Sequence, residues 1–307
     1  MNDGNAAHSS EGKPLVAVDG PNGPIRLKWH KLRTDLSQAP FKLSNLALGW
    51  KLGASLEVDI IAAADGRLVV LHDPTLGPST TGSGRVATMN ADQMSGLHHR
   101  DAARIADPDA PVVTLAELAS NLRPLPRAAS ANLQLDLKVL DGRPLGTKSI
   151  TDAAEALEGL GSTIIIGSHY LDEVRKLADA IPGARLGYDP MLAASRDQAL
   201  GRSPRRMLRH IEKRRAGVTL AYLRFDAVIR AEEQGFPLVR RLLDLGIETD
   251  AWTINSGPRT TDNLLRRLIE AGTRQVTTDT PAELGRQILR IVGKGRIWTE
   301  TNRGLRD

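Results

Sequence analysis

The stretch S-L-E-V-D-I-I-A-A-A-D-G-R-L-V-V-L-H-D, residues 55–73, decides the fold of this 307-residue chain. Residues 56–61 and 68–71 are rich in the apolar and β-branched side chains that are typical of strands. The dipeptide Asp65-Gly66 between them is a common turn between paired strands. We therefore predict that this strand turns back on itself as a β-hairpin before the chain continues.

Other short β-type runs alternate with helical patterns along the rest of the chain. Together with residues 56–61, there are eight such runs: residues 25–29, 56–61, 133–139, 163–167, 185–188, 218–225, 247–254 and 275–278. Apolar residues at a helical period of about 3.6 follow in residues 171–181 and 284–292. Strands alternating with helices favour an α/β fold, a TIM (β/α)8 barrel with a hairpin extension after its second strand. A doubly wound sheet would give much the same pattern.

The ends of the chain differ in composition from this region. We expect a disordered tail over residues 1–20, a single barrel domain over residues 21–295, and a C-terminal tail over residues 296–307. We expect no secretory signal, since the chain start lacks a basic residue followed by an apolar block. No apolar run approaches about eighteen residues, so we expect no stable membrane insertion. The absence of cysteine excludes disulfides and thiolate chemistry, and with it we expect a cytoplasmic protein.

The charge of the chain is mildly basic, with 41 Lys+Arg against 36 Asp+Glu. The excess is concentrated in residues 202–215, which read R-S-P-R-R-M-L-R-H-I-E-K-R-R. Nucleic acid or an anionic surface could use such a patch. We favour a solvated helix near the mouth of a site for anionic substrates. Because aromatic residues make up only 3%, a stacking platform for nucleic acid is not expected. The sequence gives no expectation of an oligomeric state.

Two predicted strands carry ionisable side chains on one face. Strand alternation places Glu57 and Asp59 together in one strand, and Asp136 and Lys138 together in another. Barrel strands are normally apolar on both faces, and buried carboxylates are costly unless a cation neutralises them. Oxygen ligands without sulfur favour Mg²⁺ or Ca²⁺. From alternation alone, edge strands with one solvated face explain the pattern equally well.

The hairpin suggests a histidine near these carboxylates. A two-residue turn at Asp65-Gly66 pairs position 59 with position 72, so His72 is predicted to lie beside Asp59. A histidine delivered next to a metal-binding carboxylate is a candidate general acid or base.

Residues 53–86, beginning G-A-S-L-E-V-D-I, closely resemble the glycerophosphodiester phosphodiesterase family. That family's pattern is glycine, Glu-x-Asp, a strand, Asp-Gly, His-Asp and a Thr/Gly-rich loop. His30 stands where the family has the histidine of a His-Arg-Gly motif, at the family's spacing from Glu57. The later segments L-Q-L-D-L-K, I-I-I-G-S-H-Y, A-W-T-I-N and V-T-T-D-T-P also resemble its motifs. The similarity runs from about residue 25 to residue 284.

The resemblance implies a TIM barrel with its site at the C-terminal ends of the strands. It implies one Mg²⁺ or Ca²⁺ on Glu57, Asp59 and Asp136, and hydrolysis of a small-molecule phosphodiester. It also implies catalysis by His30 and His72: one assists attack on phosphorus and the other protonates the leaving oxygen. Attack by a neighbouring substrate hydroxyl, which gives a cyclic phosphate, is an alternative first step. The expected substrate-binding residues are Lys31, Arg33, Lys138, His169 and Trp252. Further residues around the site are expected to include Asn255 and Asp279, the latter alternatively a helix cap.

Several positions depart from the family pattern. Lys31-Leu32 replaces Arg-Gly, with Arg33 as a candidate substitute for the arginine. Asp136 replaces a glutamate, as in sphingomyelinase D-type relatives, and His169 replaces a phenylalanine. These changes bear on the substrate: a glycerophosphodiester is the default, and a bulkier, polar sugar phosphodiester of agrocinopine type would suit the altered pocket. A non-catalytic phosphodiester-binding barrel and a phosphodiester synthase or transferase remain alternatives.

Overall fold

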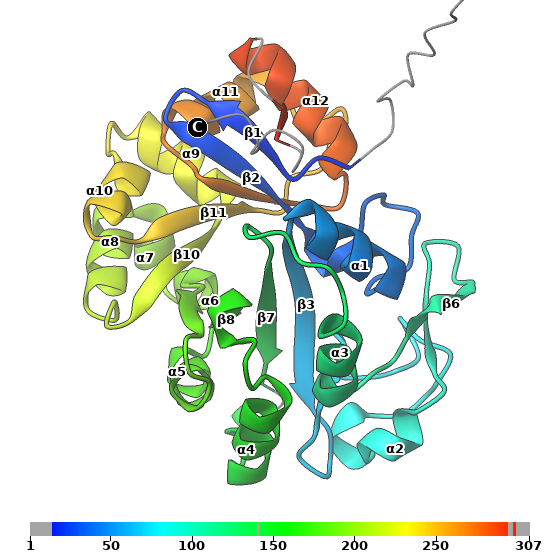
Figure 1. Ribbon diagram of the computed structural model, residues 1–307. Helices are drawn as coiled ribbons and strands as arrows, with labels where there is room; N and C mark the ends of the chain where they lie inside the picture. The colour runs from blue at the N-terminus through cyan, green and yellow to red at the C-terminus, as the bar shows by residue number, and fades with distance from the viewer. Residues whose placement is uncertain (1–13, 140–141, 294–296, 299–307) are drawn as a thin grey trace, which may run out of the picture.

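The computed structural model describes residues 14–139, 142–293 and 297–298 (Figure 1). Within them, eight parallel strands form a closed barrel. They are β2 (Gly23–Trp29), β3 (Ser55–Ala62), β7 (Asn132–Lys138), β8 (Ile164–Ser168), β9 (Arg185–Tyr188), β10 (Val218–Arg224), β11 (Glu248–Trp252) and β12 (Gln275–Thr278). The last strand pairs in parallel with the first, and the first pairs with β3. This closure confirms the predicted TIM barrel and all eight predicted strands, and it excludes a doubly wound sheet.

Helices cover the outside of the barrel. They are α1 (Leu43–Leu52), α3 (Leu115–Leu122), α4 (Thr147–Ala156), α5 (Leu171–Ala180), α6 (Met191–Arg196), α7 (Gln198–Arg202), α8 (Pro204–Glu212), α9 (Phe225–Glu233), α10 (Leu238–Asp244), α11 (Asp262–Glu270) and α12 (Pro281–Val292). The two predicted helical patterns form α5 and α12. In α5 the periodic residues Leu171, Val174 and Leu177 are buried against the barrel, as their spacing requires. None of the helices in the described ranges combines the length and apolar character needed to cross a membrane.

The predicted hairpin is present, since β3 pairs antiparallel with β4 (Leu68–Val70). Its predicted register is wrong by one residue. Ala62 pairs with Leu68, and the Leu71 amide donates to the Asp59 carbonyl at 3.1 Å. Leu71, rather than His72, therefore lies opposite Asp59.

The turn itself explains the shifted register. The Ala63 amide donates to the Arg67 carbonyl at 2.9 Å, so the loop between them contains three residues instead of two. Gly66 is left-handed, with φ 84°, which is the position that a three-residue hairpin loop reserves for glycine. One added loop residue moves every later partner by one position.

An insertion follows the hairpin before the chain returns to the barrel. It contains η2 (Val86–Thr88), α2 (Ala91–Met94) and a two-stranded sheet of β5 (His98–Arg100) and β6 (Ala106–Pro111). Figure 1 shows α2 near the far end of β3, with β6 farther to the right, beyond α3. Leu71, Leu76 and Val86 pack with the outer end of β3 in a small apolar core of their own. His99 of β5 is fully buried, with its ring edge-on to Phe41 at a centroid distance of 4.9 Å.

The predicted tails include residues that form strands in the structure. Ala17–Gly20 forms β1, which pairs antiparallel with β2, so the N-terminal part of the barrel sheet begins before residue 21. Ile297–Trp298 forms β13 and pairs with β1. Residues 1–13, 296 and 299–307 of the predicted tails lie outside the described residues.

We expect buried His99 to make the fold less stable as pH falls below about 6.5. Burial lowers the pKa of His99 to about 4. The unfolded chain takes up a proton below about pH 6.5, whereas the folded chain does not until about pH 4. The stability is therefore complete above this window and is lost as pH falls through it, by up to about 3 kcal/mol.

Urea unfolding of the wild type and of His99→Leu at pH 7 and at about pH 4.5 measures this contribution. The free energy of unfolding of the variant should change less between the two pH values than that of the wild type. Equal changes in the two proteins would show that His99 is not the group responsible.

Candidate active site

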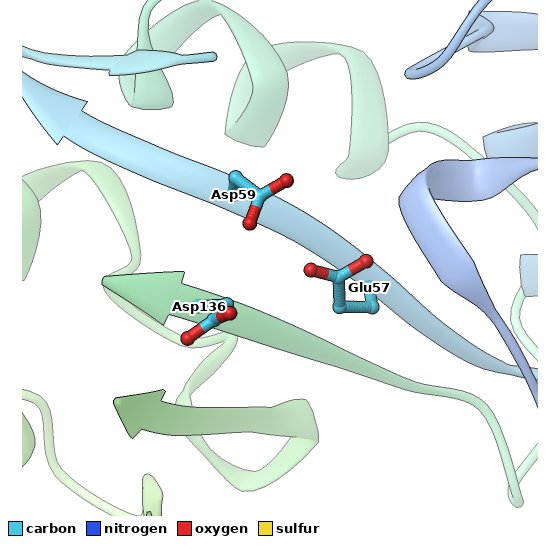
Figure 2. Close-up of side chains that lie close together, drawn as sticks. All are labelled: Glu57, Asp59 and Asp136. Atoms are coloured by element: carbon cyan, nitrogen blue, oxygen red, sulfur yellow. The ribbon is translucent and has the colours of Figure 1, made fainter. Parts of the chain in front are cut away.

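Three carboxylates gather where β3 and β7 lie side by side. Register pairs Asp59 directly with Asp136, and Glu57 lies two residues earlier in β3. One carboxylate oxygen from each of the three residues lies within 4.8 Å of the others. Figure 2 shows the side chains of Glu57 and Asp59 on β3, close to that of Asp136 on the neighbouring β7. Because β3 pairs with β2 on one side and β7 on the other, the interpretation as a solvated edge strand is excluded.

Two lysines surround the fully buried Asp59. Lys138 Nζ lies 2.9 Å from Asp59 Oδ1 and 2.6 Å from Asp136 Oδ2, and Lys31 Nζ lies 3.5 Å from Asp59 Oδ2. Burial would raise the pKa of Asp59, but Lys138 and Lys31 outweigh it and hold this pKa well below its usual range. Burial likewise opposes the charge on Lys138, yet Asp136 and Asp59 raise its pKa above the ordinary value. Asp59 is therefore ionised and Lys138 is cationic.

Glu57 has a different electrostatic environment. It is buried, and its Oε2 accepts a hydrogen bond from the backbone amide of Lys31 at 2.6 Å. Burial and the neighbouring charge of Asp59 raise the pKa of Glu57 to about 7, while His30 and Lys28 act in the opposite direction. Glu57 is thus the carboxylate of the three that most needs further positive charge to remain ionised.

These carboxylates fit a hard divalent cation. They offer oxygen ligands alone, the donor type that Mg²⁺ and Ca²⁺ prefer. Asp59 Oδ2 is buried and accepts no hydrogen bond from any residue in the described part of the chain. Two lysine ammonium groups also leave three ionised carboxylates with an excess of negative charge, which a cation at this position would offset.

His30 is held in place from the opposite end of the chain. It begins the short helix η1 (His30–Leu32) at the end of β2, and its Nδ1 lies 2.9 Å from Asp279 Oδ1, just after β12. Asn255 Nδ2 donates to Asp279 at 2.8 Å. Burial would raise the pKa of Asp279, but His30 and Asn255 lower it below its usual value. An ionised Asp279 therefore orients the ring and leaves Nε2 of His30 available for chemistry.

This arrangement places Asn255 and Asp279 around the site, as the sequence indicated. Asp279 does not cap a helix, since the N-cap position of α12 is Thr280.

The two residues after His30 adopt a strained backbone. Lys31 and Leu32 have φ values of 53° and 57°, in the left-handed region that costs a non-glycine residue roughly 1–2 kcal/mol. The Phe41 amide donates to the Lys31 carbonyl at 2.7 Å and supports this turn. The turn directs the Lys31 amide to Glu57 and its ammonium group to Asp59. Lys31 thus contacts both carboxylates of β3. Its place at the arginine position of the family's His-Arg-Gly motif did not indicate these contacts.

Of the other predicted site residues, His72, His169 and Trp252 line one cavity in the described part of the chain and Arg33 does not. His72 is 45% exposed, with Nδ1 2.8 Å from Asp73 Oδ1. His169 Nδ1 lies 3.4 Å from Asp189 Oδ1; burial lowers the pKa of His169, but Asp189 outweighs it and raises this pKa. Arg33 instead approaches Asp279 at 3.6 Å and does not line the cavity formed by the described residues.

A cavity of about 350 Å³ joins these groups. Its lining residues are Lys28, His30, Lys31, Glu57, Asp59, His72, Gln134, Asp136, Lys138, His169, Asp189, Tyr222, Trp252, Thr253 and Thr277. His72 therefore shares the cavity with the carboxylates even though its predicted strand register was wrong. A larger hollow of about 610 Å³ lies around α9 and α10 and contains none of the predicted site residues.

Sequence reasoning missed the polar residues deeper in the barrel. Lys28 Nζ lies 2.5 Å from Asp250 Oδ2 and also donates to Gln134. Gln275 and Thr277 donate to Asp250, each at 2.8 Å. The signal was present, because these polar residues interrupt barrel strands in the same alternating manner as Glu57 and Asp59.

Comparison with known proteins agrees with this geometry. The model of the glycerophosphoryl diester phosphodiesterase family matches residues 45–283. No curated protein matches the chain. Among solved structures, a glycerophosphodiester phosphodiesterase from Parabacteroides distasonis is 19% identical, with a TM-score of 0.61, covering 86% of this chain and 96% of that one. One from Agrobacterium tumefaciens is 18% identical, with a TM-score of 0.59, covering 86% and 98%.

A phosphodiesterase from Oleispira antarctica, solved in complex with the product sn-glycerol-3-phosphate, is also similar. It is 18% identical, with a TM-score of 0.59, covering 85% of this chain and 96% of that one. At these identities the structures establish a shared fold, whereas the family match spans most of the barrel. The chain therefore belongs to the glycerophosphoryl diester phosphodiesterase family, whose members are phosphoric diester hydrolases.

Proposed function

We propose that this chain hydrolyses glycerophosphodiesters with the help of one divalent cation, Mg²⁺ or Ca²⁺. The observation that carries the proposal is the convergence of charged and catalytic-type side chains on one cavity at the C-terminal ends of the barrel strands, namely Glu57, Asp59, Asp136, Lys31, Lys138, His30 and His72. The similar Oleispira antarctica protein binds sn-glycerol-3-phosphate as a product, which supports a small-molecule substrate of this class. The lack of cysteine favours a reducing compartment, and we propose the cytoplasm.

In this proposal the phosphodiester lies against the charged side of the cavity. Lys31 and Lys138 offset negative charge on the phosphoryl oxygens. A cation bound by Glu57, Asp59 and Asp136 would supply further charge stabilisation there.

The two histidines move the protons. His30, oriented through Nδ1 by ionised Asp279, is suited to accept a proton at Nε2 from the attacking water or substrate hydroxyl. His72, at the rim, is suited to protonate the leaving alcohol oxygen. Attack by a neighbouring substrate hydroxyl would give a cyclic phosphate, which water then opens.

One observation favours a second candidate substrate. The pair of His169 and Asp189 makes one wall of the cavity polar, and Asp189 favours the charged form of His169. Such a wall suits an arm rich in hydroxyl groups, so a sugar phosphodiester of agrocinopine type is the second candidate.

We expect chelation to remove the activity reversibly. Without a cation the three carboxylates repel both each other and the phosphate, so EDTA-treated protein should release no glycerol 3-phosphate from glycerophosphodiesters. Added Mg²⁺ or Ca²⁺ should restore the release, which an enzymatic assay of the product follows. Full activity after complete chelation would contradict the metal requirement. Metal-loaded, folded protein that binds these diesters without hydrolysing them would instead support a non-catalytic barrel.

A further inference from the structure

Tyr222 lines the same cavity from β10, the strand paired with β9 and β11. Its side chain is buried and lies across two inward-facing glycines of neighbouring strands. A Cβ atom on Gly167 of β8 would be 2.6 Å from Tyr222 Cε2, and one on Gly187 of β9 would be 2.5 Å from the same atom. These distances are well inside van der Waals contact. The ring therefore occupies the space that two side chains would take in an ordinary barrel.

A charged group fixes the ring from another side. Lys28 Nζ lies 4.5 Å from the centroid of the Tyr222 ring, within the range of a cation–π interaction. The same ammonium group is held by Asp250 at 2.5 Å, and both residues are almost fully buried. The ring is thus packed between two strands and a buried ion pair, which makes it a rigid part of the cavity surface.

The cavity has two chemically different sides. The residues from β2, β3 and β7 supply the carboxylates, Lys31 and Lys138, which suit a cation and a phosphoryl group. On the other side lie Tyr222 of β10 and Trp252 of β11, with His169 and Asp189 directly after β8 and β9. Trp252 is partly buried against the apolar cluster that contains Tyr222. A phosphodiester whose phosphorus lies on the charged side therefore extends one of its two ester arms over this second side.

We propose that the Tyr222 ring closes the floor of the second side and restricts the ester arm above it to about the size of glycerol. This inference rests on the proposed function and specifies the substrate class of the same site. The cavity volume of about 350 Å³ is at the small end for ligand sites, and the cation and phosphoryl group take part of it. An arm the size of a six-membered ring needs the space that the phenol ring fills, so on this side the inference favours glycerol over the sugar arm of the second candidate substrate.

Two symmetric diesters test the restriction. Because both arms of each diester are identical, the same group lies over Tyr222 in either orientation. They are bis(glycerol) phosphate and bis(p-nitrophenyl) phosphate, assayed with Mg²⁺ or Ca²⁺ present. The Tyr222→Ala variant should raise the ratio of kcat/KM for the aromatic diester to kcat/KM for the glycerol diester by about tenfold or more over wild type. An unchanged ratio in a folded, active Tyr222→Ala variant would overturn the inference.

Tyr222→Phe is the matched control. The Tyr222 hydroxyl has no hydrogen-bond partner among the described residues, so this change keeps the ring and removes only an unpaired group. The ratio for Tyr222→Phe should stay within about twofold of wild type, whereas a ratio that moves as it does in Tyr222→Ala would contradict a role for ring size.

A second set of variants covers the case in which Tyr222→Ala does not fold. Gly187→Ala pushes the ring toward the cavity and should lower kcat/KM for both diesters, while Gly187→Ala combined with Tyr222→Leu should relieve the clash and recover the glycerol diester. If the combined variant lost kcat/KM by the product of the two single losses, the contact between Gly187 and the Tyr222 ring would not matter, and the inference would be overturned. If the wild-type protein hydrolyses neither diester, the proposed function itself is refuted. This outcome differs from an unchanged ratio in an active variant, which would refute only the role of Tyr222.

Discussion

Asp59→Asn is expected to lower kcat/KM for a glycerophosphodiester by at least about a thousandfold and to abolish tight binding of Mg²⁺ or Ca²⁺. Asp59 is the most central of the three carboxylates, with Lys138 at 2.9 Å and Lys31 at 3.5 Å. The amide has nearly the same shape but no charge. It therefore removes a charged cation ligand and leaves two partly buried lysines with less compensation.

Isothermal titration with each metal and an assay of glycerol 3-phosphate release measure the two effects. Asp107→Asn is the matched control, because Asp107 also pairs with a lysine, Lys42 at 2.5 Å, but lies in β6 outside the cavity. We expect the control to retain activity within about twofold and unaltered metal binding, as is usual for a surface ion pair. An Asp59→Asn variant that binds metal as tightly as wild type would refute the proposed ligand set.

His30→Asn and His72→Asn are each expected to lower kcat by about 10²- to 10⁴-fold with little change in metal affinity. Each variant removes one proton-transfer group while leaving the three carboxylates in place. Because the histidines act in one reaction, the double variant should be little worse than the more damaging single variant. His72 is 45% exposed, so its replacement should also leave the thermal midpoint of unfolding almost unchanged.

The pH profiles of the two variants distinguish the histidines. If His30 is the base and His72 the acid, His30→Asn should remove the acidic limb of the kcat/KM profile, and His72→Asn the alkaline limb. His210→Asn serves as the control, since His210 bonds to Tyr188 at 2.7 Å and does not line the cavity. Wild-type kcat in either site variant would exclude that histidine from catalysis.

The residue pattern was sufficient to predict the eight strands and to place the ionisable side chains of β3 and β7 on one face. It left open a doubly wound sheet and solvated edge strands, and the family resemblance favoured the barrel and the metal site. The pairing register of the hairpin depends on the exact length of its loop. Asp65-Gly66 indicated the hairpin, but Ala64 adds a third loop residue, and this displaces His72 by one position from its predicted partner.

Contacts between distant segments could not be read from the chain in this way. The pairing of His30 with Asp279 depends on barrel closure, and the position of Tyr222 depends on the absence of side chains at Gly167 and Gly187. The family resemblance supplied His30, but not the strained turn at Lys31. Backbone strain of this kind is set by the surrounding packing and has no sequence period.

The contact between His30 and Asp279 also bears on how the protein is made. The two residues are 249 positions apart, and β12, which precedes Asp279, is the last barrel strand to leave the ribosome. A nascent chain thus contains all three carboxylates and both histidines that we propose to be catalytic long before Asp279 can orient the first of these histidines. Domains form as units once their distant contacts can close, so catalytic competence should arrive with the last strand. Incomplete chains would then remain inactive toward the phosphodiesters of the cell during synthesis.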